Sequence, residues 1–139
     1  MIHINDLKEK INKELASFKK ETNAIACSVL DKDGFIIYYE KDNCLDEETF
    51  KKKMIRLFTT LETLKMINFY EKTEYISFEA NLDDIDEDIK LYSKGFKILI
   101  KSITENLILI TVFKLMENID DIIPKFDAII EKLSTYLYS

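Results

Sequence analysis

The order of patterned segments constrains the fold of this chain more than any single residue does. Apolar residues recur every three or four positions in three stretches, which indicates amphipathic helices, and shorter apolar runs between them indicate strands. The sequence predicts helix 6–20, strands 24–30 and 35–39, helix 47–69, strands 75–81, 96–103 and 107–115, and helix 121–138. Three helices and five strands in this order form one complete α+β domain, residues 1–139.

Local signals fix several of these boundaries. Asp33 and Gly34 supply the positive φ that a tight hairpin turn requires between the first two strands. Asp46 is a good N-cap for the second helix because its carboxylate can accept the free amide hydrogens of the first turn. Pro124 fits a helix only near its start, so we expect Asp120 to cap the last helix.

Two strands have the composition of a sheet centre. Residues 24–30 are small and apolar on both faces, and residues 107–113 form the most continuous apolar run of the chain. Such runs are typical of strands that are covered on both sides, so Leu109 is predicted to lie in the core. Lys97 and Lys101 share one face of strand 96–103, which predicts a partly solvated strand or one near a sheet edge.

Composition disfavours nucleic acid as a partner. The formal net charge is −6 and the pI is near 4.9, whereas phosphate binding depends on clustered Lys and Arg. The chain has a single arginine, Arg56, so bidentate recognition of phosphate is also disfavoured. It contains neither an apolar stretch of about 20 residues nor a secretion signal, so we expect a cytoplasmic protein without membrane insertion.

The residue types that enzymes need are absent or badly placed. The two glycines, Gly34 and Gly95, do not form a phosphate-binding loop, and the only histidine, His3, stands at the terminus. The two cysteines, Cys27 and Cys44, do not form a CxxC pair, and a buried structural role is predicted for Cys27. We therefore expect no catalytic residues, no cofactor and no enzyme activity.

The acidic stretch 83–88 begins like a calcium loop. Asp84, Asp86 and Asp88 have the right alternation, but Ile89 stands where the loop needs glycine. Gly95 stands where the loop needs a bidentate glutamate. The stretch is interpreted as a solvated loop, and no metal site is predicted.

The second helix has two faces with few charges. Its main apolar face predicts core packing and comprises Phe50, Met54, Leu57, Phe58, Leu61 and Leu64. The opposite side carries Ile55, Thr59, Thr63 and Met66, where a helix facing water should show Lys and Glu. This second face predicts contact with another subunit or a partner. An exposed helix with indifferent threonines is the alternative.

Two hairpin sequences resemble those of the roadblock family of dynein light chains and GTPase regulators. Residues 26–37 (ACSVLDKDGFII) resemble its first hairpin, and residues 93–113 (SKGFKILIKSITENLILITVF) resemble a later one. The element order agrees over essentially the whole chain. Two features depart from the family: Asn23-Ala24 replaces a glycine that often precedes the first strand, and the segment 82–92 is longer than the usual connection.

The resemblance implies a five-stranded antiparallel sheet with the second helix on one face and the terminal helices on the other. It also implies a homodimer in which strand 75–81 pairs with its copy and the second helices meet. The interface residues are then Ile55, Arg56, Thr59, Thr63, Met66, Tyr75, Ile76, Ser77, Phe78 and Glu79. Roadblock proteins of this type dock Ras-like GTPases or serve as assembly platforms. A role for Arg56 as an arginine finger is disfavoured because it lies in mid-helix.

The leading hypothesis is a non-enzymatic, homodimeric binding or scaffold module that docks and regulates a small Ras-like GTPase. One alternative is a small-molecule sensor of the PAS or GAF type, which would need a pocket with convergent polar groups. The other is a purely structural subunit of a larger assembly. The sequence does not separate the structural subunit from the GTPase-binding module.

Overall fold

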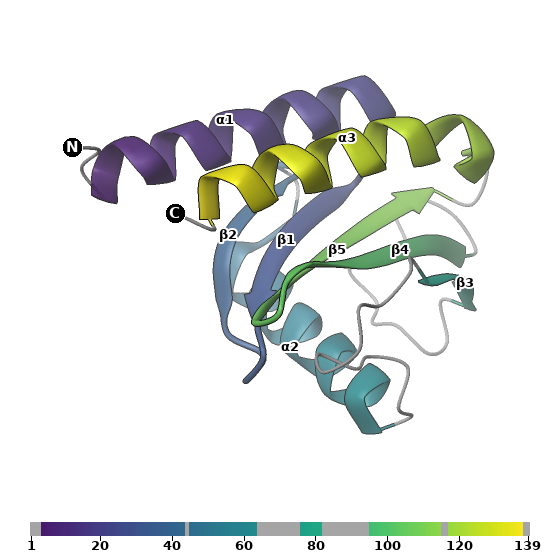
Figure 1. The fold of residues 1–139 in the computed structure, drawn as a ribbon. Coiled ribbons are helices and arrows are strands. Elements are labelled where there is room, and N and C mark those ends of the chain that lie inside the picture. The colour runs from purple at the N-terminus through teal and green to yellow at the C-terminus, as the bar shows by residue number, and fades with distance from the viewer. Residues whose placement is uncertain (1–3, 44, 64–75, 82–94, 115–116, 138–139) are drawn as a thin grey trace.

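The computed structural model describes residues 4–43, 45–63, 76–81, 95–114 and 117–137. The elements are α1 (Ile4–Thr22), β1 (Ala26–Asp31), β2 (Ile36–Lys41), α2 (Glu47–Thr63), β3 (Ile76–Asn81), β4 (Gly95–Thr104), β5 (Leu107–Lys114) and α3 (Ile119–Leu137). Figure 1 shows this order. The α+β class and the element order agree with the sequence prediction. The predicted second helix extends to residue 69, and its last six residues lie outside the described part.

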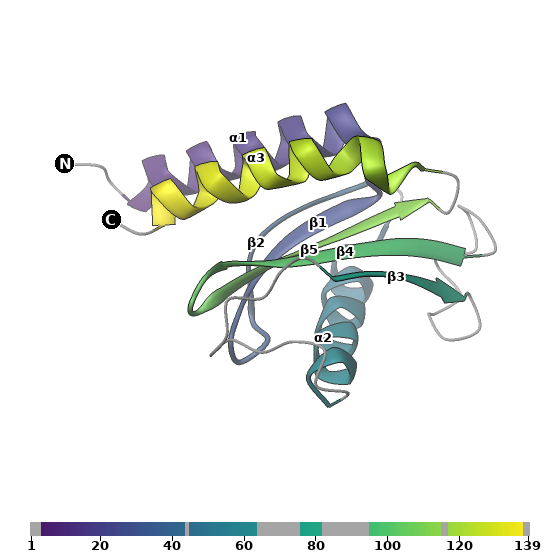
Figure 2. The same cartoon turned by 45° about the vertical axis from the view of Figure 1, so that its right-hand side comes forward.

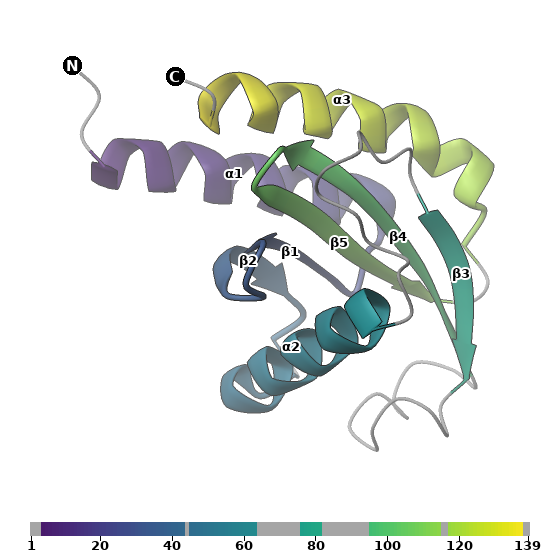
Figure 3. The ribbon, with the colours of Figure 1, turned by 60° about the horizontal axis from the view of Figure 1, so that its bottom comes forward.

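The described strands form one antiparallel sheet in the order β2-β1-β5-β4-β3. The hairpins β1–β2 and β4–β5 join through the central pair of β1 and β5, in which Val29 lies opposite Leu109. As predicted, both central strands are buried on both faces. The two edges of the sheet are β2 and β3, which lie far apart in Figure 3.

Helices cover the two faces of the sheet in separate layers, as Figure 2 shows. α1 and α3 lie side by side on one face, where Leu15, Phe113 and Phe126 belong to one buried cluster. α2 lies on the other face, where Phe50 and Phe58 pack with Ile110 in a second cluster. The sheet therefore separates two apolar cores, and alternate residues of its central strands supply them.

Two tight connections define the ends of β1. Gly34 has a φ of 89°, as its predicted role in the β1–β2 hairpin requires. A Cβ atom at Gly34 would lie 2.8 Å from the Phe58 ring, so the hairpin also packs tightly on α2. Asn23 ends α1 with a φ of 57°, and the amide of Ala24 donates to the carbonyl of Lys19. Asparagine tolerates this left-handed conformation, so it can replace the family's glycine here.

The start of α3 differs from the prediction. Asn118, not Asp120, is the N-cap, because its Oδ1 accepts a hydrogen bond from the amide of Asp120 at 3.0 Å. Pro124 therefore lies beyond the first turn, inside the helix. It has no amide hydrogen to donate to the carbonyl four residues earlier, but this position is exposed and water can solvate that carbonyl.

The lysines of β4 are partly exposed and bond to α3 and to the residue Glu117 just before it. The Lys97 ammonium donates to the carbonyl of Glu117 at 2.7 Å, and the Lys101 ammonium lies 3.0 Å from the Asp127 carboxylate. The sequence prediction was right that β4 lies near a sheet edge, since only β3 lies beyond it. It missed that α3 covers this face, because the partners lie about 20 residues away in sequence.

Leu109 offers a direct test of this core. Its side chain is fully buried between α1 and α3 and the sheet. We expect Leu109→Ala to lower the free energy of unfolding by about 2–5 kcal/mol, through lost burial and the cavity left behind. Denaturant unfolding would measure this, with the exposed Lys20→Ala as control. A loss no larger than that of the control would contradict the central position of β5.

Candidate interaction surface

Polar contacts hold the beginning of α2 against the sheet. Asp46 caps the helix as predicted: its Oδ2 accepts from the amide of Thr49 at 3.0 Å and from the Thr49 hydroxyl at 2.9 Å. These hydrogen bonds lower the pKa of Asp46 because they favour its charged form. The Tyr39 hydroxyl of β2 donates to the Glu47 carboxylate. That bond lowers the pKa of Glu47 and raises the pKa of Tyr39 to about 12.

The described part of α2 has one buried and one exposed face. Phe50, Met54 and Phe58 are buried against the sheet. On the opposite side, Arg56, Thr59 and Thr63 are exposed. The side chain of Ile55 is 43% exposed, which is high for a large apolar residue. Met66, which was predicted to extend this face, lies outside the described residues.

The hydroxyl groups of the exposed threonines are hydrogen-bonded within the helix. The Thr59 hydroxyl donates to the carbonyl of Ile55 at 2.9 Å, and the Thr63 hydroxyl donates to the carbonyl of Thr59 at 2.8 Å. Such bonds back to the preceding turn satisfy the hydroxyl hydrogens within the helix. A partner could therefore cover this face without leaving a buried donor unpaired.

Ile55 lies on the side of this face that is nearer the β1–β2 hairpin. One turn before it, the Lys51 ammonium lies 5.2 Å from the centre of the Tyr39 ring on β2. One turn after it, Phe58 packs against Gly34 of the hairpin. Residues three and four apart are neighbours on a helix, so Ile55 lies at the margin of the exposed face, next to Lys51 and to the buried Phe58.

The other predicted interface element, β3, forms an edge of the sheet. Among the described strands it pairs only with β4, with Ile76 opposite Ile100 and Glu79 opposite Lys97. The backbone of Ile76, Ser77, Phe78 and Glu79 is therefore placed, but their side chains and all of Tyr75 lie outside the described parts. The core cluster of α2 includes residues of β1, β4 and β5, and β3 lies beyond β4 at the edge of the sheet (Figure 3).

Sequence reasoning missed two exposed apolar side chains. Phe35 is 66% exposed and Ile37 is 42% exposed, although both were predicted to lie in an ordinary partner strand. The register shifts between Val29 and Leu30, which lie opposite Tyr38 and Ile36, so Ile37 is the extra residue of a β-bulge. The sequence did not predict this bulge, because nothing in the apolar run 35–39 indicates which residue is left unpaired.

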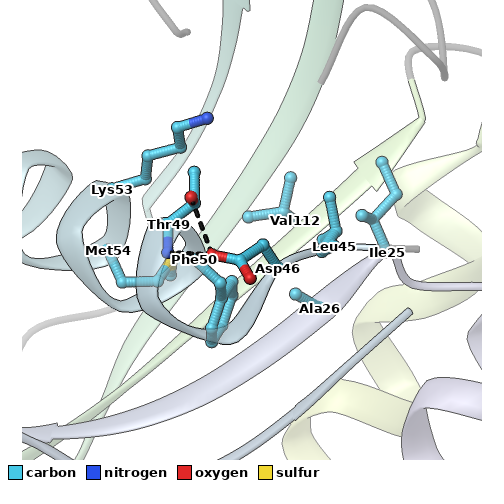
Figure 4. Close-up of a pocket in the computed structure, with 9 residues that line it drawn as sticks. All are labelled: Ile25, Ala26, Leu45, Asp46, Thr49, Phe50, Lys53, Met54 and Val112. Atoms are coloured by element: carbon cyan, nitrogen blue, oxygen red, sulfur yellow. Dashed lines mark hydrogen bonds between the residues drawn. The ribbon is translucent and has the colours of Figure 1, made fainter. Parts of the chain in front are cut away.

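A small apolar pocket lies between the start of α2 and the sheet (Figure 4). Ile25, Ala26 and Val112 of the sheet side and Phe50 and Met54 of α2 line it. Its volume is about 40 Å³, and its lining is mainly apolar. Small-molecule sites typically measure roughly 300–1,000 Å³, so this pocket does not support the sensor alternative.

Groups that could perform chemistry are sparse in the described residues. Cys27 is fully buried, and burial raises its pKa to about 12, so its thiol stays protonated and unreactive. No three His, Cys, Asp or Glu side chains cluster as a metal site would require, within the ranges that the structure describes. In the same ranges, no helix is long and apolar enough to cross a membrane. His3, Cys44 and the acidic stretch 83–88 lie outside them.

The fold has close counterparts among solved structures, although no family model and no curated protein matches the sequence. An MglB structure with a tetrameric arrangement superposes with a TM-score of 0.68 at 10% identity, over 98% of this chain and 92% of the other. The gliding protein MglB from Thermus thermophilus gives 0.64 at 13% identity, over 98% and 93%. A Roadblock/LC7 domain from Streptomyces avermitilis gives 0.67 at 6% identity, over 92% and 98%.

These similarities extend over nearly the whole of both chains, so they concern the complete arrangement of helices and sheet and not one shared motif. At identities of 6–13% they establish the fold and leave the residues of any binding surface open. The hairpin resemblance in the sequence and the arrangement in space agree: this chain has the fold of the roadblock family.

Proposed function

We propose that this chain is a homodimeric binding module that docks and regulates a small Ras-like GTPase. The observation that carries this proposal is the similarity to MglB structures and to a Roadblock/LC7 domain over more than nine-tenths of the chain. The hairpin sequences support it independently, because they resemble a family whose members regulate such GTPases. The sparse chemistry of the described residues favours binding over catalysis.

The proposed dimer interface combines the exposed face of α2 with the free edge of β3. Ile55, Thr59 and Thr63 give α2 an outer face whose hydroxyl groups are already satisfied. The β3 edge can pair with a second β3 and extend the sheet across two subunits. Arg56 lies on the exposed side of α2, where it could contribute to a partner contact. Its position in mid-helix does not favour a role as an arginine finger.

Charge on the α2 face should break the proposed dimer. We expect Ile55→Asp with Thr59→Asp to convert a dimer to a monomer, because two subunits would then bring four carboxylates together in one interface. Sedimentation equilibrium would measure the mass. A matched control is Ala16→Asp with Ala128→Asp, which adds the same charge at exposed helical positions of α1 and α3.

The dimer assignment fails if the α2 variant remains a dimer while circular dichroism shows it folded. It also fails if the control variant dissociates to the same extent, because the effect would then arise from added charge anywhere on the chain. A dissociated α2 variant beside an intact control supports the assignment.

Regulation of a GTPase predicts binding that depends on the bound nucleotide. We expect the immobilised chain to retain a small GTPase from the source organism's lysate with GDP or with a non-hydrolysable GTP analogue, but not with both. The switch segments of such a GTPase differ between these states, and a regulator distinguishes them. Titration of the purified GTPase in both states would then measure the affinity ratio.

The outcomes separate the remaining alternatives. Equal retention of a GTPase in both states would contradict regulation and favour a scaffold. Retention of no GTPase in either state would contradict the proposal as a whole.

A further inference from the structure

A second surface lies at the opposite edge of the sheet from β3. An open groove of about 550 Å³ runs along β2, and every residue of this strand lines it. Lys8 and Asn12 of α1 form one wall, and Glu47 and Lys51 of α2 form the other. Figure 3 shows β2 at this edge between the two helices.

The floor of this groove is an unpaired strand edge. Among the described strands β2 pairs only with β1, so one row of its backbone amide and carbonyl groups faces the groove. The register is regular from Tyr38 to Lys41, which lie opposite Val29 to Ala26. Four regular residues span about 13 Å, which matches the footprint of a short peptide strand.

The bulge at Ile37 closes one end of this regular stretch with apolar surface. Ile37 lines the groove and is 42% exposed, and Phe35 is 66% exposed two residues before it. A bulge on an edge strand usually prevents pairing by twisting the edge away. Here the bulge lies near the N-terminal end of β2. It therefore leaves the edge from Tyr38 to Lys41 open to pairing and places an apolar side chain beside that stretch.

The charge of the groove opposes the charge of the chain as a whole. Three lysines and two glutamates line it, Lys8, Lys41, Lys51, Glu40 and Glu47, although the chain carries a net charge of −6. The Glu47 carboxylate already has partners in the chain, because it accepts a hydrogen bond from the Tyr39 hydroxyl and lies 3.5 Å from the Lys51 ammonium. The remaining charged side chains are Lys8, Lys41 and Glu40, so an acidic ligand is favoured.

We propose that this groove binds an extended acidic peptide segment of a partner protein, which adds a strand to β2. Main-chain hydrogen bonds to Tyr38–Lys41 hold the segment, acidic side chains on its two faces lie near Lys8 on the α1 side and Lys41 on the α2 side, and an apolar side chain contacts Ile37. Strand addition of this kind uses an exposed edge for affinity and the flanking side chains for selectivity. This surface is separate from the proposed α2 and β3 interface, so each can fail without the other.

A defined peptide pair tests the proposal. The probe is an eight-residue peptide that repeats Glu-Glu-Val-Val, and its counterpart repeats Lys-Lys-Val-Val, so that each face of the added strand carries both charged and apolar side chains. On the intact chain we expect the acidic peptide to bind at least about fivefold more tightly, because the groove carries surplus positive charge. It should also slow hydrogen exchange of the β2 amides that face the groove. Methylation of the peptide amides along one edge should abolish binding, whereas methylation along the other edge should not.

A charge-matched pair of variants locates the site. Lys8→Glu with Lys41→Glu should reduce binding of the acidic peptide about tenfold or more, whereas Lys13→Glu with Lys20→Glu, which reverses two exposed lysines elsewhere on α1, should leave it unchanged. Equal losses in both variants would overturn the proposal, since binding would then follow net charge alone. Absence of peptide binding, or protection elsewhere than β2, would overturn it as well. Protection of β2 that rises with protein concentration, without peptide, would assign the edge to a second copy instead.

Discussion

The central pair of strands, β1 and β5, must be buried on both faces, and the remaining architecture follows from this requirement. Val29 and Leu109 face the core under α1 and α3, while Leu30 and Ile108 face the core under α2. A sheet centre without a polar face needs cover on each side. The two layers of helices provide that cover. β2 lies next to β1, and β4 and then β3 lie next to β5, so β2 and β3 form the edges.

α2 is held by its first turn and by a close backbone approach, and this leaves its outer face free to serve a different purpose. The Asp46 cap and the Tyr39–Glu47 bond fix its beginning, and Gly34 lets the hairpin reach the Phe58 ring. None of these contacts involves Thr59 or Thr63. The exposed Ile55, Thr59 and Thr63 therefore lie outside the contacts that anchor α2 to the sheet, which is why this face is the candidate for binding.

The sequence predicted those parts of the fold that depend on local or strongly periodic signals. The turn at Gly34, the cap at Asp46 and the burial of Leu109 each follow from a short pattern whose physical cause acts within a few residues. The cap of α3 was misplaced because Pro124 was assumed to need the first turn, whereas an exposed proline further along the helix is tolerated. The bulge at Ile37 could not be predicted, since it depends on how β1 and β2 pair.

The candidate surfaces were predictable to a different degree at each sheet edge. The α2 face could be read from the spacing of Ile55, Thr59 and Thr63, because a helix places such residues on one side whatever it packs against. The β2 groove could not, because its walls come from Lys8 and Lys51, which are 43 positions apart and meet only through the fold. The β2 edge lies between α1 and α2, which leaves room for the single strand proposed there, whereas the proposal for β3, the edge beyond β4, is pairing with a second copy of the chain. The two proposals therefore assign partners of different size to the two edges, and the helices on either side of β2 are the physical reason for that difference.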